Sequence, residues 1–291
     1  MLYDVPVTTK SLPDDRVRNP TIPPSLEPRL TLTAKKSRRG LLGRAALATT
    51  AAILGAGAGA EATHWHDTRL SPTARTAPRP ATPGSALGTR VVFQTGGESG
   101  KLALTFDDGP TAADLEPILA ALETRRVRAT FYLNGIGLEQ APDAARRLVA
   151  GGHEIGNHTW SHRRMVLVSH QTVINEIEAT DAAIRQAGYR GPITFRPPYG
   201  KKLVNLPLYL AHHHRTTVMW DVAVEDFSAH AAPQRSEDLV RLTVAQARPG
   251  SIVLLHPWHG RRATQQAIGP IIDQLQAQGY RFVTVCEVLG I

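Results

Sequence analysis

Short apolar runs alternate with longer amphipathic segments from Val91 onward, and this alternation restricts the fold more than any other feature of the chain. The runs have the length and composition of buried strands, whereas the segments between them carry apolar residues at three- and four-residue spacing, as helices do. The predicted strands are Leu102–Phe106, Ala129–Leu133, His153–Gly156, Ile193–Phe195, Thr216–Trp220, Ser251–Leu255 and Arg281–Val285. The predicted helices are Ala113–Arg126, Ala141–Ala150, Ser169–Ala187, Leu203–His214, Ser236–Ala247 and Thr264–Gln278. Roughly seven β/α units therefore predict an α/β fold, a distorted or incomplete (β/α) barrel.

Chemically reactive side chains follow several of these strands directly. In a β/α barrel the carboxyl ends of the strands meet at one rim, so residues far apart in the sequence are expected to converge there. The residues in these positions are Asp107, Asp108, His158, His162, Arg196, Asp226 and His256. We therefore expect one functional site at this rim.

His158 and His162 are four residues apart, which is interpreted as one helical turn, so that the two imidazoles can face one cation from the same side. Asp108 would add a carboxylate, and three protein ligands leave a coordination position open for water, as catalytic sites do. The only cysteine, Cys286, lies in an apolar run and is interpreted as a buried small side chain, so a multi-thiolate site is excluded. A metal held by two histidines and a carboxylate is also typical of non-haem iron oxygenases. That alternative gives no role to Asp107, and those enzymes usually have all-β folds.

The other histidines receive different interpretations. His153 opens a predicted strand and is expected to make a structural hydrogen bond, and residues 212–214, three consecutive histidines, are expected to form an exposed helix end. His259 stays a candidate because it is close to His256. The prolines after Arg196 stiffen a loop that could hold the guanidinium against a carboxylate and direct a backbone N–H into the site.

Four motifs occur in order at these predicted strand ends. They are Thr105-Phe106-Asp107-Asp108-Gly109-Pro110, His158-Thr159-Trp160-Ser161-His162, Arg196-Pro197-Pro198-Tyr199 and Leu254-Leu255-His256. In this order they resemble the successive motifs of NodB-like polysaccharide deacetylases, carbohydrate esterase family 4, over about residues 100–290. The resemblance implies a metal-dependent hydrolase on a distorted barrel, which removes acetyl groups from an N-acetylated cell-wall or extracellular polysaccharide.

The resemblance also implies individual roles. Asp108, His158 and His162 would bind one divalent metal, with Zn²⁺ ranked first and Co²⁺ or another divalent ion as alternatives. Asp107 would be the general base, held by Arg196, and His256 would be the general acid, oriented by Asp226. The substrate contacts implied by the motifs are Tyr199 through its backbone N–H, Leu254 and Phe227.

Three positions depart from the family pattern. Ala223 and Phe227 stand where an aspartate and a tryptophan are usual, and Pro257 replaces the aspartate that usually follows the catalytic histidine. Two alternatives to the N-deacetylase therefore stay open: a catalytically inactive glycan-binding module of the same fold, and an O-acetyl xylan esterase.

The first 60 residues have the pattern of an export leader. Ser37-Arg38-Arg39-Gly40 is a twin-arginine pattern, and the apolar stretch Ala45–Ala60 ends in a small-residue cleavage pattern. This stretch is shorter than the roughly 20 strongly apolar residues that span a bilayer, so a membrane anchor and a lasting membrane partner are disfavoured. Residues 61–90 are interpreted as a flexible Pro-rich spacer and residues 91–291 as the catalytic domain. The sequence thus predicts an extracellular, periplasmic or cell-wall-associated protein.

The net charge of +8 does not indicate a nucleic-acid partner. Residues 1–60 contain nine Lys/Arg and four Asp/Glu, a balance of +5, and residues 61–291 contain 24 and 21, a balance of +3. The excess thus lies mostly in the leader. After residue 60 the lysines are Lys101, Lys201 and Lys202 alone, too few for a phosphate-binding surface.

Overall fold

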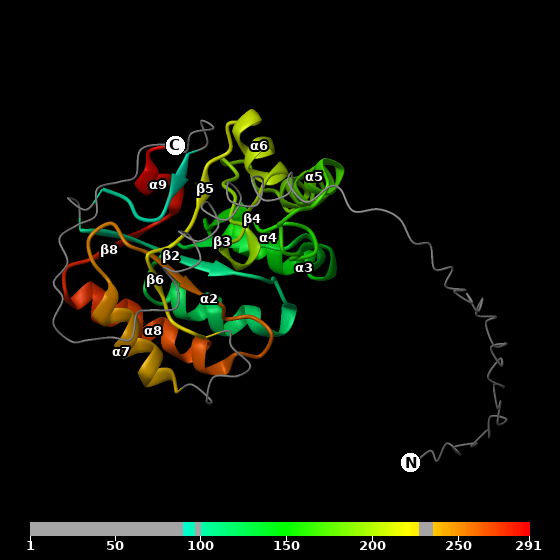
Figure 1. Cartoon of the computed structure of the whole chain (residues 1–291). Helices are drawn as coiled ribbons and strands as arrows, with labels where there is room; N and C mark the ends of the chain where they lie inside the picture. The colour runs from blue at the N-terminus through cyan, green and yellow to red at the C-terminus, as the bar shows by residue number, and fades with distance from the viewer. Residues whose placement is uncertain (1–89, 97–99, 227–234) are drawn as a thin grey trace, which may run out of the picture. The chain divides into compact units, whose positions relative to one another are not determined.

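The computed structural model describes residues 90–96, 100–226 and 235–291 (Figure 1). The predicted leader (1–60), the spacer apart from Arg90, and Phe227 lie outside the described residues. Among the helices that are described, none combines the length and the apolar character needed to cross a membrane.

The strand that organises the fold is β2 (Lys101–Asp107), whose last six residues are all buried. It pairs in parallel with β7 along one side, and with β8 and then β3 along the other. The sheet continues from β3 to β4 and from β7 to β6, which gives the order β4-β3-β2-β7-β6 with β8 attached to β2. The bounds of these strands are β3 Thr130–Leu133, β4 Glu154–Asn157, β6 Val222–Ala223, β7 Ile252–Leu255 and β8 Arg281–Val283.

A second, two-stranded parallel sheet consists of β1 (Val91–Val92) and β5 (Thr217–Val218). Phe195 connects the two sheets, because it forms parallel bridges with Asn157 of β4 and with Thr217 of β5. Gln94, after β1, forms an antiparallel bridge to Ser251 before β7. At these junctions the strands are connected by single-residue bridges, parallel at Phe195 and antiparallel at Gln94, which confirms the distorted or incomplete barrel.

The helices lie between successive strands in the chain order, except α9, which follows β8. α8 packs against α2 and α7, and α5 packs against α3 and α6 (Figure 1). Their bounds are α2 Leu115–Glu123, α3 Gly135–Gln140, α4 Pro142–Ala150, α5 His170–Gln186, α6 Asn205–His212, α7 Ser236–Gln246, α8 Arg262–Ala277 and α9 Val285–Leu289, with 3₁₀ turns η2 Ala112–Asp114 and η3 Pro198–Gly200.

The longest of the described helices, α5, shows how local sequence sets an element. The Ser169 hydroxyl accepts a hydrogen bond from the Thr172 N–H at 3.1 Å and so caps the first turn. Val173, Ile177 and Ile184 recur on one face and are buried. An apolar stripe with this period holds the helix against the core.

Three predicted strands differ from the structure. The predicted strand Thr216–Trp220 is reduced to the two residues of β5. Phe195 forms only isolated bridges, so the predicted strand Ile193–Phe195 is reduced to one paired residue. The predicted strand Arg281–Val285 ends at Val283, because Thr284 and Glu287 form a reciprocal capping box that starts α9. Cys286 is therefore a helical residue, and it is buried, as expected for a small apolar side chain.

Candidate active site

The end of β2 carries the two adjacent aspartates. Asp107 is its last residue, is buried, and pairs with Tyr132 of β3. Asp108 has a φ of 72°, so the backbone turns away from the strand and the two carboxylates can act separately. Gly109 follows with a φ of 63°, and a Cβ there would lie 2.5 Å from a ring carbon of Trp258. The turn that presents Asp108 therefore depends on a glycine at this position.

The two metal-ligating candidates after β4 lie in a loop. The prediction that their spacing represents one helical turn is wrong, since Thr159 and His162 have φ values of 68° and 54°. The loop is fixed instead by side chains: Asn157 Oδ1 accepts from the Thr159 N–H at 2.8 Å, and Glu176 of α5 accepts from the Ser161 N–H at 2.8 Å. These contacts bring both imidazoles to the rim without a helix.

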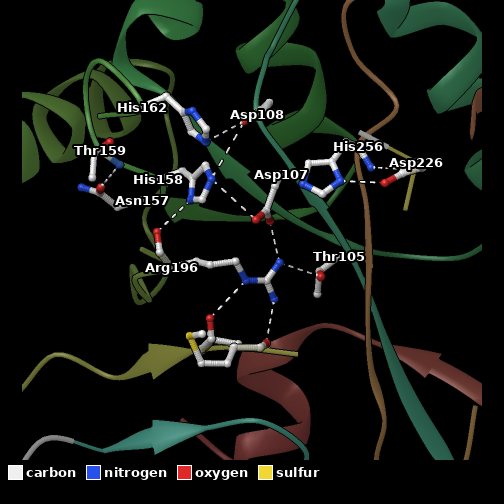
Figure 2. Close-up of polar contacts among 12 residues, drawn as sticks. Thr105, Asp107, Asp108, Asn157, His158, Thr159, His162, Arg196, Asp226 and His256 are labelled. Carbon is white, nitrogen blue, oxygen red and sulfur yellow. Dashed lines mark hydrogen bonds and ion pairs between the residues drawn. The ribbon is translucent and has the colours of Figure 1, made fainter. Parts of the chain in front are cut away.

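Asp108, His158 and His162 form a cluster suited to a metal ion. One potential ligand atom from each lies within 4.8 Å of the other two. Asp108 Oδ1 is 3.3 Å from His162 Nε2 and 3.9 Å from His158 Nε2 (Figure 2). The predicted ligands are thus together, on one face, as the open three-ligand arrangement requires.

The environment of His158 favours the form that binds a metal. Its Nδ1 is 2.7 Å from the Arg196 carbonyl oxygen, which fixes the proton on Nδ1 and leaves the Nε2 lone pair facing the two carboxylates, 3.6 Å from Asp107 Oδ2 and 3.9 Å from Asp108 Oδ1. Burial, with the charge of His162 next, lowers the pKa of His158 to about 3. A neutral imidazole with a free lone pair fits a divalent cation such as Zn²⁺.

Arg196 is fully buried and holds Asp107. Its Nη1 donates to Asp107 Oδ1 at 2.5 Å and to Thr105 Oγ1 at 2.8 Å, and its Nε and Nη2 donate to the carbonyl oxygens of Val218 and Met219. The guanidinium also lies 4.1 Å from the centroid of the Tyr132 ring. Every part of the cation is therefore fixed, and Asp107 stays a positioned carboxylate (Figure 2).

His256 follows β7 and is held by Asp226, as the sequence predicts. Asp226 Oδ2 accepts from the His256 backbone N–H at 2.6 Å, and Oδ1 lies 2.8 Å from Nδ1. Burial of His256 opposes its protonated form, but the hydrogen bond and the charge of Asp226, helped by Asp107 and Asp108, outweigh it and raise the pKa of His256. Figure 2 shows the His256 ring on the side of Asp107 away from the two metal-ligating candidates.

The predicted substrate contacts are dispersed around this centre. Tyr199 has a φ of 58°, is 56% exposed, and its ring centroid is 4.8 Å from that of His162. Leu254 is a buried residue of β7 paired with Thr105. The contact predicted for Phe227 lies outside the described residues.

The remaining histidines lie apart from this cluster. His153 accepts a hydrogen bond from the Ala129 N–H at 3.2 Å, which confirms its structural role. Residues 212–214 lie at the exposed end of α6, as predicted, where the His213 ring stacks on Tyr209. His259 is exposed and is not among the clustered ligands in the described part of the chain.

Sequence reasoning missed three residues that shape the site. Thr105 lies two residues before Asp107, and period-two alternation along the strand could have indicated that it shares the face of Asp107. Asn157 directly precedes His158 but lies outside the four motifs. Arg261, whose Nη1 is 3.9 Å from Asp108 Oδ2, gives no local signal, because only the fold brings it there.

The rim therefore combines a metal-ligating cluster, a buried carboxylate held by an arginine, and a histidine held by an aspartate. Such a set can bind a divalent cation, accept a proton from water and donate a proton to a leaving group. These are the requirements for hydrolysing an unactivated amide.

Comparisons with known proteins find relatives among polysaccharide deacetylases. The family model for polysaccharide deacetylases matches residues 95–218. The peptidoglycan-N-acetylglucosamine deacetylase PgdA of Listeria monocytogenes is 34% identical over 198 residues, which are 65% of this chain and 39% of that protein. The chain thus spans about two fifths of that relative's length.

Two solved structures share the fold. One is a peptidoglycan N-acetylglucosamine deacetylase with a TM-score of 0.64 and 32% identity, covering 68% of this chain and 92% of the other. The second is a pseudoenzyme of carbohydrate esterase family 4 from Bacillus anthracis, with a TM-score of 0.62, 25% identity and 68% coverage of each chain.

Proposed function

The chain belongs to the NodB-like polysaccharide deacetylases, carbohydrate esterase family 4, and from that premise we propose that it hydrolyses the acetamido group of N-acetylated sugars in peptidoglycan or a related cell-wall polysaccharide. The observation that carries this proposal is the placement of Asp107, held by Arg196, between the Asp108 cluster and His256 (Figure 2). A base, a metal-ligating set and an acid around one space are the parts that amide hydrolysis needs.

In this mechanism Asp107 accepts a proton from the attacking water, and Arg196 keeps its carboxylate oriented for that step. The backbone N–H of Tyr199 donates to the oxygen that becomes negative in the tetrahedral transition state. His256 then gives its proton to the departing nitrogen, because the hydrogen bond to Asp226 keeps the ring oriented and favours its protonated form. Leu254 contributes to the apolar surroundings of the acetyl methyl group.

One divalent metal, with Zn²⁺ ranked first, would be held by Asp108, His158 and His162. When bound, such an ion would lower the pKa of water toward about 7 and polarise the amide carbonyl. The chain's own contribution is to keep His158 neutral and turned with Nε2 toward the two carboxylates of Asp107 and Asp108.

We also propose that residues 1–60 direct twin-arginine export, which places the domain of residues 91–291 outside the cytoplasm with its polymeric substrate. This accords with the cell-wall substrate named for the Listeria relative. It further accords with a chain that contains one cysteine and so needs no internal disulfide.

A catalytically inactive glycan-binding module is the second candidate. Ala223 and Pro257 favour it, because both replace aspartates of the family pattern, and a pseudoenzyme is among the structural relatives. Against it, Asp107, His256 and the metal-ligating cluster are all present.

Acetate release separates the two candidates. The full chain is incubated with chitin oligomers, peptidoglycan glycan strands and O-acetylated xylan, after chelator treatment and again after Zn²⁺ or Co²⁺ is added. The proposal expects acetate from an N-acetylated glycan only when metal is restored, and little from Asp107→Asn. Binding of glycan without acetate from any substrate would favour the inactive module, and acetate from xylan alone would make the protein an O-acetyl esterase.

A further inference from the structure

Arg261 lies beside the metal-ligating cluster but has no part in the mechanism above. It belongs to the loop between β7 and α8, and its Nη1 is 3.9 Å from Asp108 Oδ2. The other oxygen, Asp108 Oδ1, is the one that faces His162 and His158. Arg261 therefore approaches the carboxylate from the side away from the histidines.

The guanidinium of Arg261 is incompletely paired. Its Nη1 is buried and has no hydrogen-bond partner among the described residues. The side chain is nevertheless 29% exposed, so part of it is open to solvent at the rim. A buried donor without an acceptor is costly, and binding an anion would relieve that cost.

The backbone around Arg261 is held in place. The Gly260 N–H donates to both carboxylate oxygens of Asp114 at 3.2 Å. Gln265 Nε2 donates to Asp114 Oδ1 and to the Pro257 carbonyl oxygen, each at 2.8 Å. The loop is therefore fixed on both sides of Arg261, and the position of its guanidinium is preorganised.

The other charges at the centre have close partners. Asp107 is paired with Arg196 at 2.5 Å, and His256 with Asp226 at 2.8 Å. Asp108 would be engaged by a divalent cation, which leaves Arg261 as an additional positive charge next to the reacting group. Such a site attracts an anionic substrate.

The rim on the His162 side is cationic as well. Arg163, Arg164 and Lys201 are exposed, and across the ranges that the structure describes none of the three forms an ion pair. The guanidinium of Arg164 lies 5.3 Å from the centroid of the Tyr199 ring, close to the site. This second feature independently favours a polymer with negative groups along its length.

We propose that Arg261 is a specificity-determining residue that binds a carboxylate carried by the substrate sugar next to its acetamido group. The substrate class is then an acidic 2-acetamido sugar, such as one with a carboxyalkyl ether on the neighbouring carbon. A guanidinium suits this role because it offers parallel N–H donors that match a carboxylate. The inference rests on the proposed deacetylase function and specifies the sugar on which it acts.

The test uses two substrates that differ only in this charge. Glycan strands containing N-acetylmuramic acid are freed of peptide, and half are converted to the carboxamide. Acetate release is measured for wild type, Arg261→Gln, Arg261→Lys and, as a matched control, Arg262→Gln, which changes the adjacent exposed arginine.

We expect Arg261→Gln to lower kcat/KM on the free acid about 10- to 100-fold, the range of a hydrogen bond to a charged group. Its kcat/KM on the carboxamide should stay close to wild type, as should its bound metal. Arg261→Lys should retain part of the wild-type preference for the free acid over the carboxamide, and Arg262→Gln should retain all of it. An equal loss on both substrates, or a loss of bound metal, would overturn the inference and make Arg261 a support for Asp108.

A binding measurement keeps this inference separate from the proposed function. In an Asp107→Asn background, calorimetry with the same two glycans should show tighter binding of the free acid only when Arg261 is present. Acetate release from neutral chitin oligomers without any Arg261-dependent preference would refute the role of Arg261 and leave the deacetylase intact. Absence of acetate from every substrate would refute the proposed deacetylase function. The calorimetric preference for the free acid would then test the role of Arg261 without any measurement of activity.

Discussion

Arg196 Nη1 lies 2.5 Å from Asp107 Oδ1, and the two side chains are 0% and 3% exposed. Both charges have lost their water, so each depends on the other and on the surrounding hydrogen bonds for its stability. The general base is thus part of the core and not a surface group.

Removal of Arg196 should therefore destabilise the whole domain. Arg196→Met is expected to lower the free energy of unfolding by about 3–5 kcal/mol, because it leaves Asp107 as an uncompensated buried charge. In an Asp107→Asn background, Arg196→Met should lower the free energy of unfolding by a smaller amount. The difference between the two effects is the coupling energy of the pair, expected to be about 0.5–3 kcal/mol. Urea denaturation of wild type, the two single variants and the double variant measures this cycle. If the two losses of unfolding free energy simply add, the pair is not coupled.

Metal binding should depend on His158. His158→Ala is expected to remove bound metal and acetate release together, while the far-ultraviolet circular dichroism stays that of the folded protein. His213→Ala is the control, since this imidazole is exposed and stacks on Tyr209 away from the cluster. Metal analysis per chain is the readout, and full metal content in His158→Ala would refute the assigned ligand set.

The pH dependence of turnover should report the His256–Asp226 pair. Because the hydrogen bond from His256 to Asp226 favours the protonated ring and the pKa of His256 is raised, activity should persist to higher pH and fall as pH passes through that pKa. Asp226→Asn removes this contribution, so the alkaline limb should move to lower pH and turnover should fall about 10–100-fold. A pH profile of kcat with an unchanged alkaline limb would show that another group is the acid.

Stability in acid should depend on His153. Burial, with a smaller effect of Arg128, lowers the pKa of His153 from 6.5 to about 4. Between these pH values the unfolded chain binds a proton that the folded protein excludes, so stability falls as pH decreases from about 6.5 to about 4, by on the order of 3 kcal/mol. His153→Gln, which keeps a possible acceptor for the Ala129 N–H, should weaken this dependence. Equal acid sensitivity of both proteins in urea titrations at pH 7 and 4 would contradict this assignment.

The exported product should begin at Glu61, directly after the small-residue pattern Ala58-Gly59-Ala60. N-terminal sequencing of secreted protein from the full-length chain checks this, with substitution of both Arg38 and Arg39 by lysine as a control that should block export. A full-length product retained in the membrane would instead indicate an anchor.

The hydrophobic periodicity of the sequence is sufficient to predict those strands and helices that are long or fully buried. It predicted β2, β3, β4 and β7 close to their observed bounds, and it predicted that their ends would meet. It could not predict β1 or β6, because each has two residues and is defined by a distant partner. It also missed α3, whose six residues are too few for a helical period to be recognised.

The site was predictable to the extent that its residues lie in local motifs. The spacing of His158 and His162 indicated that they act together, although the backbone achieves this through left-handed residues and not a helical turn. Arg261 was not predictable, since its approach to Asp108 joins segments about 150 residues apart and depends on how Asp114 holds the intervening loop.

The pairing of β2 with β7 has a consequence for how this site can change. Phe106 is the register partner of Leu255, and the residues that follow this pair are Asp107 and His256. Main-chain hydrogen bonds, which form between backbone groups whatever side chains the strands carry, therefore set the separation of the proton acceptor and the proton donor. Surrounding loops can be lengthened or rewritten for a new polymer without altering that separation. The insertion of one residue into β7, by contrast, would shift the donor relative to the acceptor without touching the elements that carry Asp108, His158 and His162.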